Sequence, residues 1–338
     1  MVNNISMGQK QAECTKDAIV IEGISKRFGK VQALDNLSLK VDEGIVFALL
    51  GPNGSGKTTL IRVLTTLLIP DSGTANVGGF DIRKNAQSIR PIIGLAGQYP
   101  AVDEDLTGRE NLEMIGRLYH LGTLKSRSRA AELLKTFELV EAADRRVKTY
   151  SGGMRRRLDL AATIVAAPSI LFLDEPTTGL DPRSRFGLWN VISKLTNDCH
   201  TVFLTTQYLE EADRLANKIA IMESGKIIRT GTPKELKECC GGETRVKLRL
   251  VDPEKTALAV ELLRELGGDQ IHSVAETGEI SLPADRGATL LSDVVRRLDA
   301  GGIYLDELGL KQPTLDDVFL AITGHAAENP PDIKEMNQ

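Results

Sequence analysis

Apolar residues along this chain gather in short runs separated by polar loops, and the lengths of these runs predict strands that alternate with helices. Largely apolar runs of four to seven residues are typical of strands buried on both faces of a parallel sheet. They occur at residues 45–50, 92–96, 170–173 and 201–207. Apolar residues at helical spacing, together with helix start signals, predict helices at 60–68, 107–118 and 126–137. The alternation predicts an α/β fold.

Two further strand signals precede the first buried run. Ile19-Val20-Ile21 is a short β-branched run, and apolar residues alternate with polar ones from Leu37 to Val41. Near the other end of this region, residues 219–222 and 226–228 predict a hairpin around Ser224-Gly225.

After Thr232-Pro233 the pattern changes and a strand-helix unit occurs twice. The strand predicted at 245–251 is followed by a helix that ends at Gly267-Gly268. A strand at 279–282 is followed by a second helix that ends at Gly301-Gly302, 34 residues after the first glycine pair (301 − 267). This recurrence predicts a small α+β domain of the ferredoxin-like kind, and it contains no cluster of catalytic residue types.

The pattern therefore divides the chain into segments of different character. We expect a large α/β domain with a helical insert, a small accessory domain, and loose polar segments at both ends. The predicted segments are a flexible start at 1–17, the α/β domain at 18–239 with its insert at about 99–168, the accessory domain at 240–324, and a disordered tail at 325–338.

Composition narrows the functional classes. A chain of 338 residues with 41% hydrophobic residues is ordinary for roughly two globular domains, and a net charge of −4 argues against general affinity for nucleic acid. The four cysteines follow no disulfide or zinc spacing, and residues 1–16 lack the apolar core of a signal peptide. We expect a cytoplasmic protein. The longest apolar stretch, 160–173, is interrupted by Pro168, so contact with a membrane requires a partner chain.

The strongest chemical signal is the segment Gly51-Pro52-Asn53-Gly54-Ser55-Gly56-Lys57-Thr58-Thr59, which lies between a predicted strand and a predicted helix. Its glycines permit backbone conformations that turn consecutive N–H groups toward an anion at the helix N-terminus. The Lys57 ammonium suits the β- and γ-phosphates of a nucleoside triphosphate, and the Thr58 hydroxyl suits a magnesium ion that bridges them. The segment predicts a Mg-nucleotide site; a glycine turn beside a solvated lysine is the simpler alternative.

Two carboxylates follow the buried run Ile170-Leu171-Phe172-Leu173. Asp174, at the tip of the strand, is placed to hold the magnesium shell, and Glu175 is placed to accept a proton from the attacking water. Gln98 follows another predicted strand. Ligands of α/β sheets gather at the carboxyl ends of strands, so Gln98 can reach the metal or the water. Taken alone, Gln98 is better explained as a loop amide that faces water.

Other residues allow both a structural and a functional interpretation. Phe28 can stack on a base or belong to the core. Ser151-Gly152-Gly153 is a helix N-cap that leaves N–H groups open to a phosphate. Asp181, before Pro182, is explained fully as a helix cap. The arginines at 155–157 are expected to form a solvated or ion-paired face.

In their order and intervals, these motifs resemble those of ABC-type ATPases. The resemblance covers about residues 18–235, and its most specific part is the signature motif at Ser151-Gly152-Gly153. Four segments look like the daunorubicin/doxorubicin-resistance subfamily of bacterial drug exporters. They are Gly97-Gln98-Tyr99, Tyr150 to Asp159 with Thr205-Thr206-Gln207-Tyr208-Leu209, and the ending Thr314 to His325.

The resemblance implies the P-loop fold of an ABC nucleotide-binding domain, ATP and Mg²⁺ as ligands, and a homodimer in which the signature motif of each subunit faces the phosphate loop of the other. It implies a separate transmembrane permease, with the chain peripheral on the inner face of the membrane. It also implies adenine stacking by Phe28, a magnesium and permease contact by Gln98, a cross-dimer position for Asp181, and a γ-phosphate contact by Gln207.

Two departures from the commoner ABC pattern stand in this sequence. Where this chain has Gln207, most ABC ATPases, which it otherwise resembles, have a histidine. A glutamine can donate a hydrogen bond to the γ-phosphate but cannot become cationic. The daunorubicin-type subfamily resembles this chain in carrying glutamine there. The signature motif is flanked by Tyr150 and Met154 in place of leucine and glutamine.

Two other functions remain open at this point. The first is an ABC ATPase that acts on the ribosome or nucleic acid. Three features disfavour it: the single cassette, the short interval of 94 residues between Lys57 and Ser151 (151 − 57), and the excess of acidic residues. The second is a P-loop kinase for a small molecule, for which no acceptor pocket is suggested. The sequence favours an ATPase subunit that powers export of a drug-like or hydrophobic compound.

Overall fold

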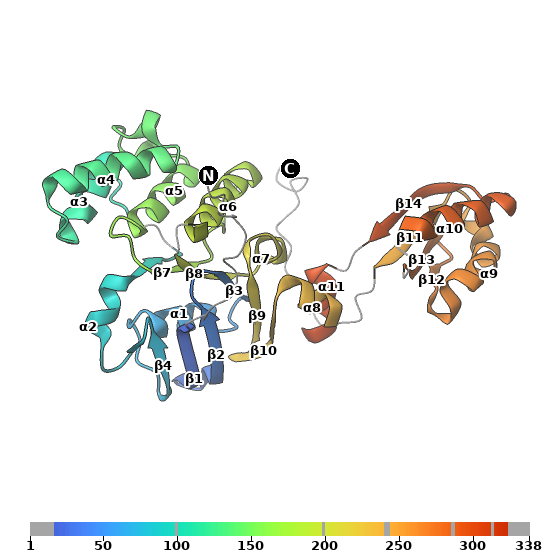
Figure 1. Cartoon of the computed structure of the whole chain (residues 1–338), viewed down its shortest axis with the longest axis horizontal. Helices are drawn as coiled ribbons and strands as arrows, with labels where there is room; N and C mark the ends of the chain where they lie inside the picture. The colour runs from blue at the N-terminus through green and yellow to red at the C-terminus, as the bar shows by residue number, and fades with distance from the viewer. Residues whose placement is uncertain are drawn as a thin grey trace, which may run out of the picture. The chain divides into compact units, whose positions relative to one another are not determined.

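The computed structural model describes residues 17–98, 101–197, 200–239, 244–284, 288–311 and 314–323. The described chain divides between Thr230 and Gly231 into two compact units, which are described separately below (Figure 1). The flexible start and the tail that the sequence predicts lie outside the described residues, except that Asp17 is the first residue of strand β1. No helix within the described ranges combines the length and the apolar composition that a membrane span requires.

A six-stranded sheet is the centre of the first unit. Its order is β10-β9-β3-β8-β7-β6, and the pairs β3/β8, β3/β9, β7/β8 and β6/β7 are parallel. The strands are β3 (Val46–Leu50), β6 (Ile93–Ala96), β7 (Ile170–Asp174), β8 (Thr201–Thr206), β9 (Lys218–Glu223) and β10 (Lys226–Gly231). The parallel register brings the carboxyl ends of β3, β8, β7 and β6 together at one edge. All six strands were predicted from the apolar pattern.

A second, antiparallel sheet has the order β2-β1-β4-β5. Its strands are β1 (Asp17–Phe28), β2 (Val31–Asp42), β4 (Ser72–Val77) and β5 (Phe80–Asp81). Strands β4 and β5 have too few apolar residues to give a sequence signal. They are fixed by pairing, since Ile19 and Ile21 of β1 lie opposite Val77 and Ala75 of β4.

The helices of the first unit are α1 (Lys57–Leu64), α2 (Ala86–Ile89), α3 (Gly108–Leu118), α4 (Thr123–Thr136), α5 (Gly152–Thr163), α6 (Pro182–Asn197) and α7 (Leu209–Leu215), with short 3₁₀ turns at Arg90–Ile92, Val140–Ala142 and Val147–Thr149. The predicted capping box of α3 is confirmed, because Thr107 Oγ1 accepts from Glu110 N and the Glu110 side chain accepts from Thr107 N. Helix α1 ends at Leu64, before residue 68, which was the predicted end. Thr66, two residues later, has a positive φ of 62°.

Two hydrophobic cores lie on opposite faces of the parallel sheet. Alternate residues of β7 point to opposite sides: Phe172 packs with Phe203 and Phe47 against α1 and the antiparallel sheet, whereas Leu171 and Leu173 pack against the helices. Helices α3, α4 and α5 form the insert, which is drawn in green in Figure 1. Burial on both faces explains why the sheet strands are continuously apolar.

The second unit contains α8 (Pro233–Cys239), β11 (Arg245–Leu250), α9 (Thr256–Gly267), β12 (His272–Val274), β13 (Glu279–Pro283), α10 (Ala288–Ala300), β14 (Leu305–Lys311) and α11 (Leu315–Thr323), with 3₁₀ turns at Pro253–Lys255 and Gly268–Gln270. Its strand order is β12-β13-β11-β14. The pairs β11/β13, β11/β14 and β12/β13 are antiparallel. Leu263 of α9 and Val294 of α10 are buried in a core with Val246 and Leu248 of the sheet.

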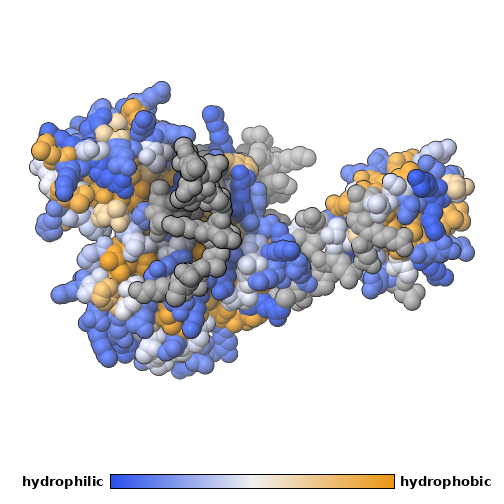
Figure 2. Space-filling model, viewed as in Figure 1, coloured by the Kyte–Doolittle hydropathy of each residue, from blue (hydrophilic) through white to orange (hydrophobic). Residues whose placement is uncertain are grey.

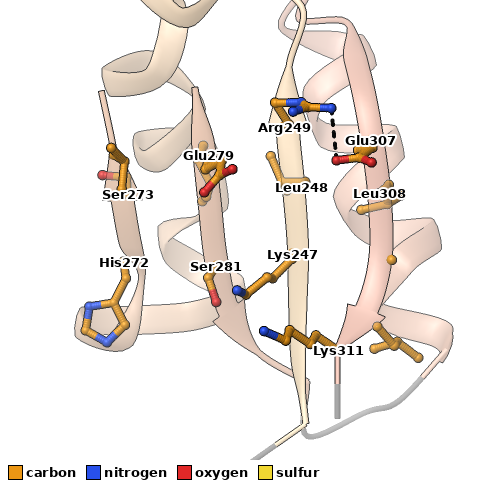
Figure 3. Close-up of a pocket in the computed structure, with 14 residues that line it drawn as sticks. Lys247, Leu248, Arg249, His272, Ser273, Glu279, Ser281, Glu307, Leu308 and Lys311 are labelled. Atoms are coloured by element: carbon orange, nitrogen blue, oxygen red, sulfur yellow. Dashed lines mark ion pairs between the residues drawn. The ribbon is translucent and has the colours of Figure 1, made fainter. Parts of the chain in front are cut away.

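A hollow of about 610 Å³ lies on this sheet (Figure 3). Lys247 and Lys311 lie beside each other at one end, and Arg249 forms an ion pair of 3.1 Å with Glu307 at the other. All the residues that line the hollow belong to the segment 247–311. None of the site residues that the sequence predicts contributes to it.

Candidate functional site

The glycine-rich loop after β3 is held between two other parts of the first unit. Gly54 and Gly56 have positive φ angles of 79° and 108°, which residues with a Cβ rarely adopt. A Cβ on Gly51 would overlap the carbonyl oxygen of Met222, and one on Gly56 would overlap that of Ala33. The loop therefore needs glycine for conformation and for space.

The side chains of the loop are placed unequally. Asn53 and Gly54 are exposed, Thr59 is half-buried, and Ser55 is buried. Ser55 Oγ has no hydrogen-bond partner among the described residues. A buried hydroxyl without a partner is costly, so the loop offers an unused polar group to a ligand.

Lys57 and Glu175 meet, although 118 residues separate them in the sequence (175 − 57). Lys57 Nζ lies 3.2 Å from Glu175 Oε1 and donates to the carbonyl oxygens of Gly51 (2.7 Å) and Pro52 (3.0 Å). Both side chains are at least nine-tenths buried, with 4% and 9% of their surface exposed. The buried lysine is thus paired with one anion and two loop carbonyls.

The three residues predicted to hold a metal also come together. Thr58 Oγ1, on α1, lies 3.2 Å from Asp174 Oδ1 at the tip of β7. Gln98 Nε2, just after β6, lies 3.5 Å from Thr58 Oγ1. Thr205 on β8 donates to Asp174 Oδ1 at 2.6 Å and fixes that carboxylate. The sequence missed Thr205, because nothing in it indicates that the threonine lies opposite Asp174 on the neighbouring strand.

The backbone of Glu175 adopts a left-handed conformation, with φ of 48°. This conformation costs a residue with a Cβ about 1–2 kcal/mol, so neighbouring contacts must maintain it. Its N–H donates to the Thr205 carbonyl oxygen at 3.1 Å, and Thr178 Oγ1 lies 3.4 Å from its Oε2. The turn directs the carboxylate toward Lys57.

Gln207 follows the end of β8, the strand between β3 and β7. Its Oε1 is buried and has no hydrogen-bond partner in the described part of the chain. The structure therefore leaves this amide oxygen available, next to β3, which precedes the loop of Lys57, and β7, which precedes Glu175.

Phe28 is the last residue of β1, and 49% of its surface is exposed. The interpretation as a core residue is therefore wrong. Lys26 Nζ lies 5.7 Å from the centre of the ring. The stacking role of Phe28 stays a prediction.

The signature segment caps α5. Ser151 Oγ accepts from Met154 N at 3.2 Å, and both Ser151 and Gly152 are exposed. A Cβ on Gly153 would overlap the Ser184 side chain, so α5 approaches α6 closely there. Asp181 caps α6 by accepting from Ser184 N (3.0 Å) and Ser184 Oγ (2.6 Å). Ser184 thus links the predicted residues Gly153 and Asp181.

The three arginines do not behave alike. Arg155 pairs with Glu104 at 2.7 Å and Arg157 with Glu138 at 3.3 Å, which confirms the ion-paired face for these two. Arg156 is buried, with 8% of its side chain exposed, so a solvated position is wrong for it. The acid three residues later, Asp159, was the available signal: it pairs with Arg156 at 3.4 Å.

This arrangement defines a class of protein. A glycine-rich loop joins a buried parallel strand to a helix, its lysine meets acids at the tip of a second parallel strand, and an inserted helical segment carries a serine-glycine cap. These are the features of a P-loop nucleotide-binding domain.

Comparison with known proteins identifies the family. The profile of the ABC transporter family matches residues 34–178. The chain is 47% identical over 312 residues to the daunorubicin resistance ATP-binding protein DrrA2 of Streptomyces coeruleorubidus, covering 92% of this chain and 97% of that protein. It is 43% identical to the doxorubicin resistance ATP-binding protein DrrA of Mycobacterium tuberculosis, covering 92% and 95%. The chain belongs to the ATP-binding subunits of ABC transporters, in the group of the daunorubicin and doxorubicin resistance proteins.

The solved structures agree with the family. An ATP-binding cassette whose dimer was solved in a post-hydrolysis state with ADP and phosphate is 26% identical, with a TM-score of 0.58 over 63% of this chain and 98% of that one. The resemblance seen in the sequence is confirmed. ABC ATPase domains bind and hydrolyse ATP, and membership favours the transport function over action on nucleic acid.

Glu211 is a buried acid near this site that the sequence did not indicate. It lies on α7, has no exposed surface, and its Oε1 accepts from Trp189 Nε1 at 3.0 Å. Burial raises the pKa of Glu211 above the ordinary 4.5, more than the hydrogen bonds and the positive charge of Arg185 lower it. The folded state therefore holds the proton more tightly than the unfolded state does.

This sign predicts how Glu211→Gln changes stability with pH. Because the pKa of Glu211 is raised in the folded state, the free energy of unfolding of the wild type falls progressively as pH rises above about 4.5, the pKa in the unfolded chain. A neutral amide at this position removes that loss of stability. We expect the free energy of unfolding of E211Q, relative to wild type, to increase from pH 4.5 to pH 8, as measured by urea unfolding.

Glu210→Gln is the matched control, because Glu210 is the neighbour of Glu211 in the sequence and is exposed. It should show no such increase. A pH-independent loss of stability in E211Q would contradict the prediction and indicate that Glu211 is charged in the native state.

Proposed function

We propose that this chain is the ATP-hydrolysing subunit that powers export of a drug-like or hydrophobic compound through a separate membrane subunit. The observation that carries the proposal is the convergence of Lys57, Thr58, Asp174 and Glu175 at one edge of the parallel sheet. This arrangement occurs in a chain 47% identical to a daunorubicin resistance ATP-binding protein.

The residues fit ATP and Mg²⁺. The loop 51–56 needs glycine and has the unpartnered Ser55 hydroxyl, as expected of a cradle for phosphates. Thr58 offers a hydroxyl, Asp174 a carboxylate and Gln98 an amide. These groups supply the oxygen ligands that Mg²⁺ prefers, and Mg²⁺ is usually held by only a few protein groups. The amide of Gln98 turned by 180° presents its oxygen to the same place. When bound, magnesium would neutralise the charge that develops on the phosphates.

The roles of the chain's own residues follow from their contacts. When phosphate oxygens replace Glu175 and the loop carbonyl groups as partners of Lys57, the Glu175 carboxylate is freed. It then accepts a proton from water. Gln207 Oε1, which has no partner in the described chain, is available to accept a hydrogen bond from the water, and the amide N–H groups of Gln207 would donate to the γ-phosphate. Asn53, Gly54, Gly56 and Thr59 complete the phosphate loop.

We assign the signature segment to the partner's nucleotide. Ser151 and Gly152 are exposed at the N-terminus of the 12-residue helix α5, which carries a partial positive charge. Together with Gly153 they would cap the triphosphate held by the second subunit of a homodimer, with Asp181 beside the interface. Exposed Phe28 would stack on the adenine.

Exposed apolar residues on the insert suggest where the membrane subunit docks. Met114, Leu118 and Tyr119 at the end of α3, and Leu124 at the start of α4, are 37%, 69%, 46% and 82% exposed. Figure 2 shows apolar surface at the end of the first unit where α3 and α4 lie. Such a patch is typical of a protein interaction site. The chain would then be peripheral on the inner face of the membrane, without a nucleic-acid partner.

The second unit is proposed to be a ferredoxin-like accessory domain. The order β12-β13-β11-β14, the antiparallel pairs and the two intervening helices support this topology. We place the domain boundary near residue 240, as the sequence indicates, within a few residues of the division at Gly231. A role in stabilising the dimer or docking on the membrane subunit suits a folded unit without a catalytic cluster.

Glu175→Gln tests the catalytic role. Loss of the general base is expected to lower ATP turnover by roughly 10²–10⁴-fold. ATP binding should persist, since the amide keeps the size of the carboxylate, and ATP should hold E175Q as a dimer detectable by light scattering. Wild-type turnover in E175Q would refute the assignment.

Gly152→Asp tests the head-to-tail dimer. A Cβ at Gly152 has open space around it, and an acid in the first turn favours the helix, so the fold should be unaffected. The new negative charge would face the partner's phosphates, so E175Q/G152D should form no ATP-dependent dimer. E175Q/T123D is the control, because it adds the same charge at the exposed start of α4. An undiminished dimer in E175Q/G152D would exclude this arrangement.

Leu118→Gln with Leu124→Gln tests docking of the permease. The pair should abolish co-purification in detergent with a multi-span membrane protein and leave basal ATP hydrolysis within about twofold, since both side chains are exposed. Ile69→Gln, at a residue 71% exposed, is the control. Retained co-purification would place the permease interface elsewhere. The same measurement on a chain that ends at Lys237 shows whether the second unit contributes to binding of the permease. Recovery of ribosomes in place of a membrane protein would contradict the transport function.

A further inference from the structure

Arg156 lies in the interior of the first unit and contacts two segments that are distant from it in the sequence. Its Nη1 donates to the carbonyl oxygen of Gly97 at 2.6 Å, and its Nε donates to that of Pro176 at 2.7 Å. Its Nη2 lies 3.3 Å from the carbonyl oxygen of Asp174 and 3.4 Å from that of Glu175. One planar guanidinium thus holds the backbone on both sides of the catalytic glutamate and the residue before Gln98.

Asp159 keeps this cation in place. It lies one turn later on α5, 3.4 Å from Nη1, and its other oxygen accepts from Ala101 N at 2.7 Å. Burial lowers the pKa of Arg156 and raises that of Asp159, so each charge depends on the other and on its hydrogen bonds. A buried arrangement of this kind tolerates little displacement.

The contacts of Arg156 coincide with the strained part of the site. Glu175 is held at a φ of 48°, and the carbonyl groups of residues 174, 175 and 176 all point to the guanidinium. Three converging carbonyl dipoles would repel one another without a cation between them. Arg156 is therefore the group that balances the cost of this turn.

We propose that Arg156 is a positioning residue for catalysis: it clamps the backbone of residues 174–176 and of Gly97, and so fixes where the Glu175 carboxylate and the Gln98 amide point. The clamp belongs to α5, the helix that begins at Ser151. The placement of a subunit's own general base therefore depends on the seating of the helix whose N-terminus faces the partner. The proposal rests on the assigned role of Glu175.

Arg156→Gln is the test, with Arg156→Lys as a milder variant. Glutamine cannot bridge four carbonyl groups, so the Glu175 carboxylate should lose its position. Misplacement on this scale lowers kcat by about 10–10²-fold, whereas KM for ATP should change less than about twofold, because Phe28 and the phosphate loop are untouched. Lysine keeps the charge without the fork and should restore part of kcat.

A second measurement does not depend on activity. In nucleotide-free protein, hydrogen exchange of the backbone amides of Glu175, Thr177 and Thr178 should be faster in R156Q than in wild type. Arg155→Gln is the matched control on the same helix, since its side chain pairs with Glu104 at the surface; it should change neither exchange nor kcat.

The outcomes separate the proposal from a structural role and from the function proposed above. Unchanged kcat in R156Q, or unchanged exchange at 175–178, overturns it. So does a loss of kcat that E175Q/R156Q shows in full on top of the E175Q loss, because the part of the Arg156 effect that acts through the Glu175 carboxylate cannot add to the removal of that carboxylate. If E175Q alone keeps wild-type turnover, the base assignment fails, and the exchange measurement still decides whether Arg156 clamps this turn.

Discussion

The buried ion pair between Lys57 and Glu175 is the interaction on which the rest of the first unit depends. A lysine and a glutamate that are almost fully buried must satisfy each other, and Lys57 also uses the Gly51 and Pro52 carbonyl groups. An arriving polyphosphate can replace both kinds of partner at once. The pair therefore keeps the Lys57 ammonium and the Glu175 carboxylate side by side next to the glycine-rich loop.

The helical insert is joined to this centre by side chains rather than by the sheet. Ser184 lies between Gly153 of α5 and Asp181 before α6, and Arg156 reaches from α5 to the turn after β7. A movement of α5 cannot leave the catalytic turn unaffected, because its contacts are buried and directional. Helix α5, which begins after Ser151, is thus tied to the turn that follows β7.

The second unit follows a different logic. Its sheet packs against α9 and α10, and the hollow seen in Figure 3 is lined by residues of the strands, with paired and like charges but with no glycine-rich loop among its lining residues. Lys247 has its pKa lowered by the neighbouring Lys311 more than by its limited burial. The unit thus differs in chemistry from the catalytic edge, which agrees with an accessory role.

The sequence alone determined the buried strands, the phosphate loop, the capping boxes and the paired acids, because each depends on local order: apolar period, glycine at fixed spacing, and a polar residue directly after a strand. It also carried the family resemblance. Only the tertiary structure decided that Thr205 fixes Asp174, that Phe28 is exposed, and that Arg156 is a buried clamp while its neighbours Arg155 and Arg157 face solvent. These facts depend on which surfaces meet when sheet and helices pack, and a burial of that kind leaves no periodic trace in the chain.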